Sequence, residues 1–167
     1  MNDKKKNEPT IHLMHGYMGV GKTTIAKKLA DELSAVRLSF DDFMTTLYPN
    51  PPYEFFNEYF KRIDKLIWNI AEKIVNAGAD VIYDSCLLSK QDRANAFENA
   101  SKITDNVIFY YVKCDMKTAE KRVIARTISD EKGEEMVINE SNFYLPLPQF
   151  EPISESEGYK IVVFENS

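Results

Sequence analysis

The apolar positions of the chain follow two alternating periods. Short apolar runs of strand length are separated by longer stretches in which apolar residues recur every three or four positions, the spacing of a helix face. Strands that alternate with helices form βαβ units and build a parallel sheet. The sequence therefore predicts an α/β fold, a three-layer sandwich with helices on both faces of the sheet. The predicted strands are 10–15, 36–40, 80–84, 107–112 and 160–164, and the predicted helices are 22–34, 56–77, 90–101 and 116–127.

Two segments refine this outline. The run 107–112 is apolar without polar alternation, which is typical of a strand covered on both faces. On the predicted helix 90–101, the spacing of Ala94, Phe97 and Ala100 predicts an inward face.

The length of 167 residues suits one domain, which we place at 10–167. Residues 1–9 are charged and are predicted to form a disordered tail. The stretch 129–157 is polar, acidic and contains prolines, so we predict loops there and a lid near 126–135.

Composition and charge narrow the class of protein. Hydrophobic residues make up 44% of the chain and charged residues 28%, as in ordinary globular proteins. No apolar run approaches the roughly 20 residues that span a bilayer, and the N-terminus lacks the apolar core of a secretory signal. We expect a cytoplasmic protein without a membrane partner, in which Cys86 and Cys114 are buried, reduced thiols.

The net charge of −5 and the pI of about 5.2 argue against a long nucleic-acid partner, because such binders usually carry a basic face. The only lysine run is 4–6, near the N-terminus. The oligomeric state has no signature in the sequence.

Residues 16–23, GYMGVGKT, match the phosphate-binding pattern G-x-x-x-x-G-K-[ST] between a predicted strand and a predicted helix. Glycines in such a loop let backbone N–H groups point at phosphate oxygens, beside the positive end of the helix. Lys22 can reach the β- and γ-phosphates, and the Thr23 hydroxyl can ligate Mg²⁺. We therefore predict that ATP with Mg²⁺ binds here. The predicted nucleotide-binding residues are Gly16, Gly19, Val20, Gly21, Lys22, Thr23 and Thr24.

Further motifs follow this loop in a recognisable order. They are the segment Ser39-Phe40-Asp41-Asp42, the segment Val81-Ile82-Tyr83-Asp84-Ser85, Arg93, and a helix with Arg122 and Arg126. From about residue 10 to 128, the chain resembles small P-loop kinases related to the 5′-kinase domain of phage polynucleotide kinase, chloramphenicol phosphotransferase and zeta toxins. The resemblance implies a five-stranded parallel sheet with the P-loop on its central strand.

Asp41 is the candidate general base. It follows the second predicted strand, and open α/β sheets bind ligands at the carboxyl ends of their strands. The resemblance implies that its carboxylate takes the proton of an acceptor hydroxyl. The alternative is that Asp41 and Asp42 only cap a helix that begins near Phe43. Met44 stands where the phage kinase carries an arginine, which departs from the pattern of a kinase for nucleotide 5′-ends.

The remaining candidates come from later motifs. Asp84 ends a strand, which suits it to hold Mg²⁺ or contact the acceptor, or alternatively to cap the next helix. By resemblance, Asp84 and Arg93 are substrate-binding residues, although Arg93 equally fits a surface position. Arg122 and Arg126 lie four apart and share a helix face. The resemblance makes them a catalytic lid pair, and the alternative is an ordinary charged surface.

These features together predict an enzyme, a P-loop kinase that transfers the γ-phosphoryl of ATP·Mg²⁺ to a hydroxyl of a small molecule or nucleotide-like acceptor. One alternative is a regulatory ATPase or switch without a phosphorylated acceptor. Another is a toxin-type kinase that acts on a nucleotide-sugar. The identity of the acceptor stays open at this point.

Overall fold

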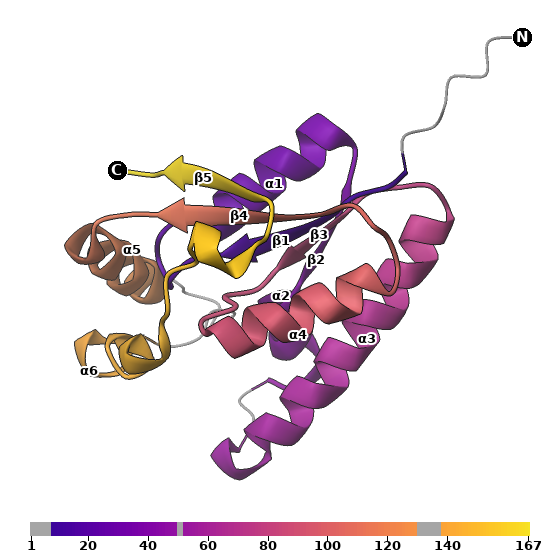
Figure 1. The fold of residues 1–167 in the computed structure, drawn as a ribbon. Helices are drawn as coiled ribbons and strands as arrows, with labels where there is room; N and C mark the ends of the chain where they lie inside the picture. Colours follow the sequence, from indigo (N-terminus) through magenta and orange to yellow (C-terminus); the bar gives the residue numbers. More distant parts are fainter. Residues whose placement is uncertain (1–7, 50–51, 130–137) are drawn as a thin grey trace, which may run out of the picture.

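In the computed structural model, residues 8–49, 52–129 and 138–167 are described. They contain a parallel sheet of five strands in the order β2-β3-β1-β4-β5, with the P-loop strand β1 at its centre (Figure 1). The α/β fold and the central place of the P-loop strand are thereby confirmed. The strands are β1 Ile11–His15, β2 Val36–Ser39, β3 Val81–Asp84, β4 Val107–Lys113 and β5 Ile161–Glu165.

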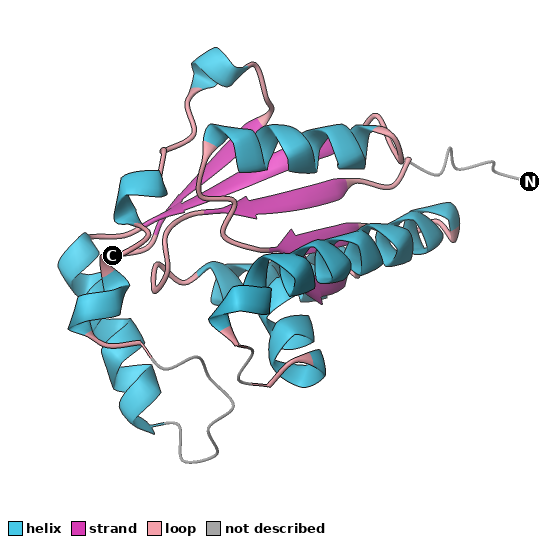
Figure 2. Ribbon diagram, turned by 90° about the horizontal axis from the view of Figure 1, so that it is seen from below, coloured by secondary structure: helices cyan, strands magenta, loops and turns pink. Residues whose placement is uncertain are grey.

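The helices agree with the predicted segments, apart from their ends and several short additions. They are α1 Lys22–Leu33, α2 Phe40–Leu47, α3 Phe56–Asn76, α4 Lys90–Ser101, α5 Met116–Ser129 and α6 Glu140–Phe143, with 3-10 turns η1 Tyr53–Phe55, η2 Leu147–Gln149 and η3 Glu155–Glu157. Figure 2 shows helices on either side of the strands. No helix among the described residues is both long and apolar enough to cross a bilayer.

The start of α2 corrects one alternative interpretation. The backbone N–H of Asp42 donates to the Oγ of Ser39, 3.2 Å away, so Ser39 is the N-cap and the helix begins at Phe40. Asp41 and Asp42 therefore lie in the first turn of α2 rather than at its cap. Their negative charges are favourable there, beside the positive end of the helix.

Two apolar clusters cover the two faces of the sheet. Ile11 and Leu13 of β1 pack with residues of α3 and α4, whereas Met14 packs with residues of α1 and α5 on the other face. This alternation follows from the period of two in a strand. The strand β4 is largely buried throughout, as its unbroken apolar run predicted.

Because all five strands are parallel, their carboxyl ends meet at one edge of the sheet. The P-loop, the start of α2, the segment after β3 and the start of α5 all leave the sheet at this edge, where such folds bind ligands. Residues 130–135 of the lid predicted near 126–135 lie outside the described residues, as do residues 1–7 of the predicted tail.

Candidate active site

The P-loop connects β1 to α1 and is packed directly against α5. Gly19 has a φ of +76°, and a Cβ built there would lie 2.3 Å from the carbonyl oxygen of Ala119 and 2.5 Å from a methyl group of Val123. The motif therefore requires glycine at this position for two reasons, the left-handed backbone and the close approach of the helix.

Lys22 closes the loop from within. Its side chain is only 8% exposed, and its Nζ donates a hydrogen bond of 2.7 Å to the carbonyl oxygen of Tyr17. A buried ammonium needs such a partner, because an unpaired buried charge is costly. The lysine is thus held over the loop, in the position from which it can turn toward a phosphate.

A crevice of about 200 Å³ lies at this edge of the sheet and collects side chains from five separate segments. Its walls come from the P-loop, the first turn of α1, the start of α2, the segment after β3 and α5. The lining residues are Met18, Gly19, Gly21, Lys22, Thr23, Thr24, Asp41, Asp84, Ser85, Cys86, Arg122, Val123 and Arg126. The structure therefore brings together the predicted site residues, except that Gly16 and Val20 do not line this crevice and Arg93 lies elsewhere.

The two adjacent aspartates have different surroundings. Asp41 lines the crevice, whereas Asp42 does not. The Oδ2 of Asp42 is instead 2.9 Å from the Nη1 of Arg37. Asp41 is exposed as a residue, yet its carboxyl group is partly desolvated in the crevice, and this raises its pKa. Lys22 opposes that rise, the negative charges of Asp84 and Asp42 add to it, and Arg126 again lowers the pKa.

Asp84 ends β3 and is 5% exposed. Its Oδ2 accepts two contacts from the guanidinium of Arg37, from Nε at 2.8 Å and from Nη2 at 2.7 Å. Arg37 lies on the neighbouring strand β2, where Ser39 is in register with Asp84. Desolvation opposes the charged form of Arg37, but the carboxylates of Asp84 and Asp42 outweigh it and raise its pKa. Arg37 was not among the predicted site residues, although a charged residue inside a strand is a signal that a partner lies nearby.

The crevice carries oxygen donors of the kind that Mg²⁺ prefers. The oxygen-bearing side chains of Thr23 and Asp84 both line it, and Mg²⁺ commonly uses one or two protein ligands together with phosphate oxygens. Among the described residues, no group of three His, Cys, Asp or Glu side chains is arranged to hold a metal by itself. The donor set therefore fits a metal that arrives with a phosphate ligand.

Arg93 does not lie in the crevice, and its predicted substrate-binding role is corrected. Its side chain is fully buried, with Nε and Nη2 bound to the carboxylate of Glu157 at 2.9 and 2.7 Å and Nη1 bound to the carbonyl oxygen of Glu151 at 2.7 Å. Every nitrogen of the guanidinium is thus engaged by the segment before β5. Arg93 anchors that segment to α4.

The inward face of α4 also differs from the prediction. The buried residues are Arg93, Ala96 and Ala100, while Ala94 and Phe97 are only half-buried. The buried stripe is rotated because the paired guanidinium of Arg93 occupies the interior.

Arg122 and Arg126 both line the crevice from α5, four residues apart, as predicted for one helix face. Both residues are exposed. The Nη1 of Arg122 is 3.5 Å from the Sγ of Cys114 and 3.5 Å from the carbonyl oxygen of Asn166, and these long contacts leave it easily displaced.

The two cysteines are free and half-buried. Cys86 lines the crevice, which the sequence analysis did not foresee. Desolvation raises the pKa of its thiol, Lys22 opposes this rise, and Asp41 adds to it.

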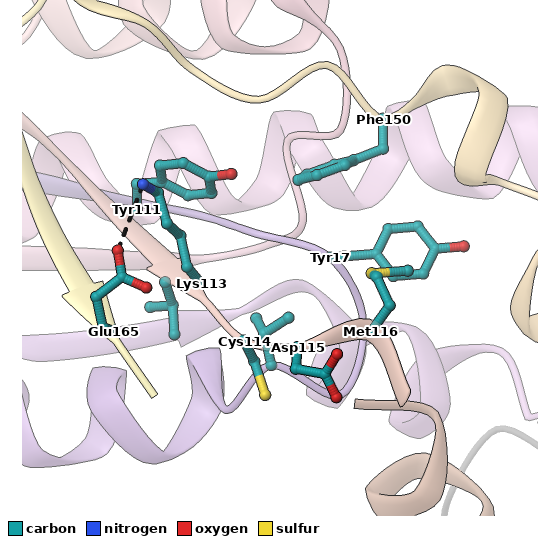
Figure 3. A pocket seen from close by; sticks show the side chains of 10 residues that line it. Tyr17, Tyr111, Lys113, Cys114, Asp115, Met116, Phe150 and Glu165 are labelled. Carbon is teal, nitrogen blue, oxygen red and sulfur yellow. Dashed lines mark ion pairs between the residues drawn. The ribbon is translucent and has the colours of Figure 1, made fainter. Parts of the chain in front are cut away.

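A larger cavity, of about 390 Å³, shares no lining residue with the crevice. As Figure 3 shows, Tyr17 and Met116 lie on one side of it, opposite the ion pair of 3.4 Å between Lys113 and Glu165, with Phe150 above. It contains none of the predicted catalytic side chains. Size alone therefore does not identify the active site, and the convergent charged groups favour the smaller crevice.

Several solved structures share this fold. A provisionally designated kinase of Chloroflexus aurantiacus has a TM-score of 0.76 and 16% identity, covering 96% of this chain and 90% of that chain. Chaetomium thermophilum Kti12 in complex with ADP-AlF3 has a TM-score of 0.71 and 16% identity, covering 93% and 88%. The Mycobacterium tuberculosis APS kinase CysC in complex with AMPPNP and APS has a TM-score of 0.64 and 13% identity, covering 95% and 88%.

No curated protein sequence matches the chain at a significant level. A protein family described as an AAA domain matches residues 11–148, which include the P-loop and every residue of the crevice. The predicted resemblance to P-loop kinases is confirmed by these comparisons. The chain belongs to this AAA-domain family.

Proposed function

We propose that the protein is a kinase that transfers the γ-phosphoryl group of ATP to a hydroxyl of a small acceptor. The observation that carries this proposal is that the carboxylate of Asp41 shares one crevice with Lys22 and the P-loop. Burial of that carboxylate raises its pKa, and a base with a raised pKa is better matched to proton transfer near neutral pH.

The phosphates of ATP would lie on the P-loop amides at the start of α1, where the helix dipole favours negative charge. Lys22 would exchange its hydrogen bond with Tyr17 for one with a phosphate oxygen. Bound Mg²⁺, held by Thr23 and Asp84 with the phosphates, would supply neutralising charge.

In the chemical step, the acceptor oxygen forms a bond to the γ-phosphorus while the bond to the bridging oxygen of ADP breaks. The hydroxyl proton passes to Asp41. The phosphorylated acceptor and ADP are the two products. Arg122 and Arg126 place positive charge beside the crevice, where it opposes the negative charge on the transferring oxygens.

A small acceptor is favoured by the volume of the crevice and by the acidic net charge. Met44 supports this choice, because it is buried in the apolar cluster with α3 and does not face the crevice. An antibiotic, a sugar-like metabolite and a nucleoside are the acceptor classes that remain, with a nucleic-acid 5′-end disfavoured by charge.

A regulatory ATPase or switch is the second candidate. The observation that favours it is the likeness to Kti12, whose structure was solved with ADP-AlF3. In such a protein, ATP turnover would not depend on a base for an acceptor hydroxyl.

The two candidates are separated by phosphoryl transfer from γ-labelled ATP to a panel of aminoglycosides, chloramphenicol, nucleosides, sugars and 5′-hydroxyl oligonucleotides. A kinase gives a labelled acceptor, and Asp41→Asn lowers the transfer rate by about 10² to 10⁴-fold, the usual contribution of a positioned base. Asp42→Asn is the matched control, because its carboxylate lies outside the crevice and its loss affects the rate far less. ATP turnover without a labelled acceptor, unchanged in Asp41→Asn, would contradict the kinase and favour the switch.

A further inference from the structure

Arg37 joins two carboxylates that flank the candidate base. Its Nε and Nη2 bind the Oδ2 of Asp84, and its Nη1 binds the Oδ2 of Asp42 at 2.9 Å. The side chains of Arg37 and Asp84 are 14% and 5% exposed, so their ion pair is mostly shielded from water, whereas Asp42 is 67% exposed and its pair with Arg37 lies at the surface. The same guanidinium does not bind Asp41. That residue is next to Asp42 in the chain and lines the crevice together with Asp84.

Arg37 supplies positive charge where three carboxylates follow the ends of two adjacent strands, with Asp41 and Asp42 just after β2 and Asp84 at the end of β3. Like charges at short range raise one another's pKa, and a buried carboxylate without a partner is strongly destabilising. Asp84 is buried, so without a counter-charge it would be costly in its ionised form. The planar fork of arginine can satisfy two carboxylates at once, which a lysine ammonium does less well.

We propose that Arg37 is the positioning residue of this site, which holds Asp84 and Asp42 as ion pairs and leaves Asp41 as the carboxylate that receives the proton of the acceptor. The assignment of Asp41 as base rests on the proposed function. The division of the three carboxylates by Arg37 rests only on the geometry.

The charged and titratable groups around Asp41 come from every neighbouring element. Lys22 faces it from α1, Asp84 from the end of β3, and Cys86 from the segment after β3, while Asp42 is its neighbour on α2 and Arg126 faces it from α5. Arg37 acts through Asp84 and Asp42, whose negative charges it screens. If Arg37 loses its charge, both carboxylates act on Asp41 unscreened, and Asp41 holds its proton to higher pH.

The first test uses the nucleotide-free protein and does not need an acceptor. The ¹³Cγ shift of Asp41 is titrated by NMR in the wild type, Arg37→Gln and Arg37→Lys, with assignment by Asp41→Asn. The midpoint for Asp41 moves to higher pH in Arg37→Gln and by a smaller amount in Arg37→Lys. Arg62→Gln is the control and leaves the midpoint unchanged, since Arg62 lies on α3, where it forms an exposed ion pair with Glu58.

A double variant keeps the test decisive where Arg37→Gln alone fails to fold. Arg37→Gln with Asp84→Asn removes the buried pair as a neutral unit, so the midpoint for Asp41 lies near the wild-type value. An Asp41 midpoint that is identical in the wild type and Arg37→Lys, with the double variant displaced from both, would overturn the proposal.

The second test uses the pH profile of kcat/KM with a labelled acceptor. Arg37→Gln lowers kcat/KM by about tenfold at pH 6 and by less than about threefold at pH 9, because a raised pKa of the base lowers the rate only at a pH where the base is protonated. An equal loss at both pH values would show that Arg37 has only a structural role. A complete absence of acceptor labelling would instead refute the kinase, while the NMR titration would still decide the role of Arg37.

Discussion

The Nζ of Lys22 donates a hydrogen bond to the carbonyl oxygen of Tyr17, 2.7 Å away, so the lysine of the phosphate loop binds its own loop. The ammonium is thereby desolvated and oriented before a phosphate arrives. Part of the cost of ordering this flexible side chain is met during folding, and less is left for nucleotide binding.

The contribution of Lys22 to nucleotide binding can be measured directly. Lys22→Ala removes the one P-loop side chain that carries positive charge to the phosphates, so we expect the affinity for ATP to fall by at least about tenfold. Isothermal titration calorimetry provides the measurement. Lys27→Ala, on the exposed side of α1, is the control and leaves the affinity unchanged. An unaltered affinity in Lys22→Ala would contradict the assigned role.

Two glycines with nearly equal φ angles allow the cost of a left-handed backbone to be measured apart from the cost of a steric clash. Gly19 and Gly158 have φ values of +76° and +78°, but a Cβ at Gly158 meets nothing within 4 Å, whereas one at Gly19 meets the backbone of α5. Gly158→Ala should lower the free energy of unfolding by about 1 kcal/mol, the cost of the left-handed backbone. Gly19→Ala adds displacement of α5, and its total cost should reach about 3 kcal/mol. Urea unfolding measures both, and equal losses would show that α5 does not press on the loop.

His15 predicts a specific loss of stability in acid. Its Nδ1 donates to the carbonyl oxygen of Leu87 and its Nε2 accepts the N–H of Ile153, which fixes the neutral ring. Desolvation, followed by the charge of Arg93, lowers its pKa from 6.5 to about 4. Between pH 6.5 and about pH 4, His15 is therefore protonated in the unfolded chain but neutral in the folded protein. The free energy of unfolding falls as the pH drops through this range.

The loss due to His15 should approach about 3 kcal/mol by pH 4 and vanish above pH 7. Denaturant unfolding from pH 4 to 8 measures it in the wild type and in His15→Gln, which does not ionise. The raised pKa of Asp41 acts in the opposite direction, so Asp41→Asn in both backgrounds isolates the histidine. An unchanged pH slope in His15→Gln would assign the acid loss to other groups.

The buried ion pair of Arg93 predicts a loss of stability without a loss of nucleotide affinity. Arg93→Met leaves the carboxylate of Glu157 and the carbonyl oxygen of Glu151 without their partner, which should lower the free energy of unfolding by about 3–5 kcal/mol. The folded fraction should still bind ATP as tightly as the wild type. Lys102→Ala breaks an exposed pair with Glu98 and serves as the control without a measurable change. Weakened ATP binding by folded Arg93→Met would restore a role for this residue at the site.

The parts of the fold that sequence predicts are those fixed by local periodicity. The strands, the main helices and the P-loop follow from residue spacing within one segment, and the glycines of the loop have a local conformational cause. Arg93 shows where local reasoning ends. Arg93 lies on the same buried face of α4 as Ala96 and Ala100. Its charge is tolerated there because Glu157, 64 residues later in the chain, forms an ion pair with it.

Arg37 shows the same limit for the candidate site. Its pairing with Asp84 depends on the register of β2 against β3, which sequence spacing does not define. Arg37 also pairs with Asp42, while Asp41 lines the crevice. Asp84 is 47 residues away from Arg37 in the chain, so only the folded sheet brings this pair of the candidate site together.

The contact between Gly19 and Ala119 also has a mechanical consequence. Ala119 and Val123 of α5 lie directly against Gly19 of the phosphate loop, while Arg126 lies in the last turn of the same helix. A rotation of the whole helix would drive the backbone of Ala119 into the loop. Arg126 already lines the crevice, so its exposed side chain can turn toward a bound phosphate while the backbone of α5 stays in place against the loop.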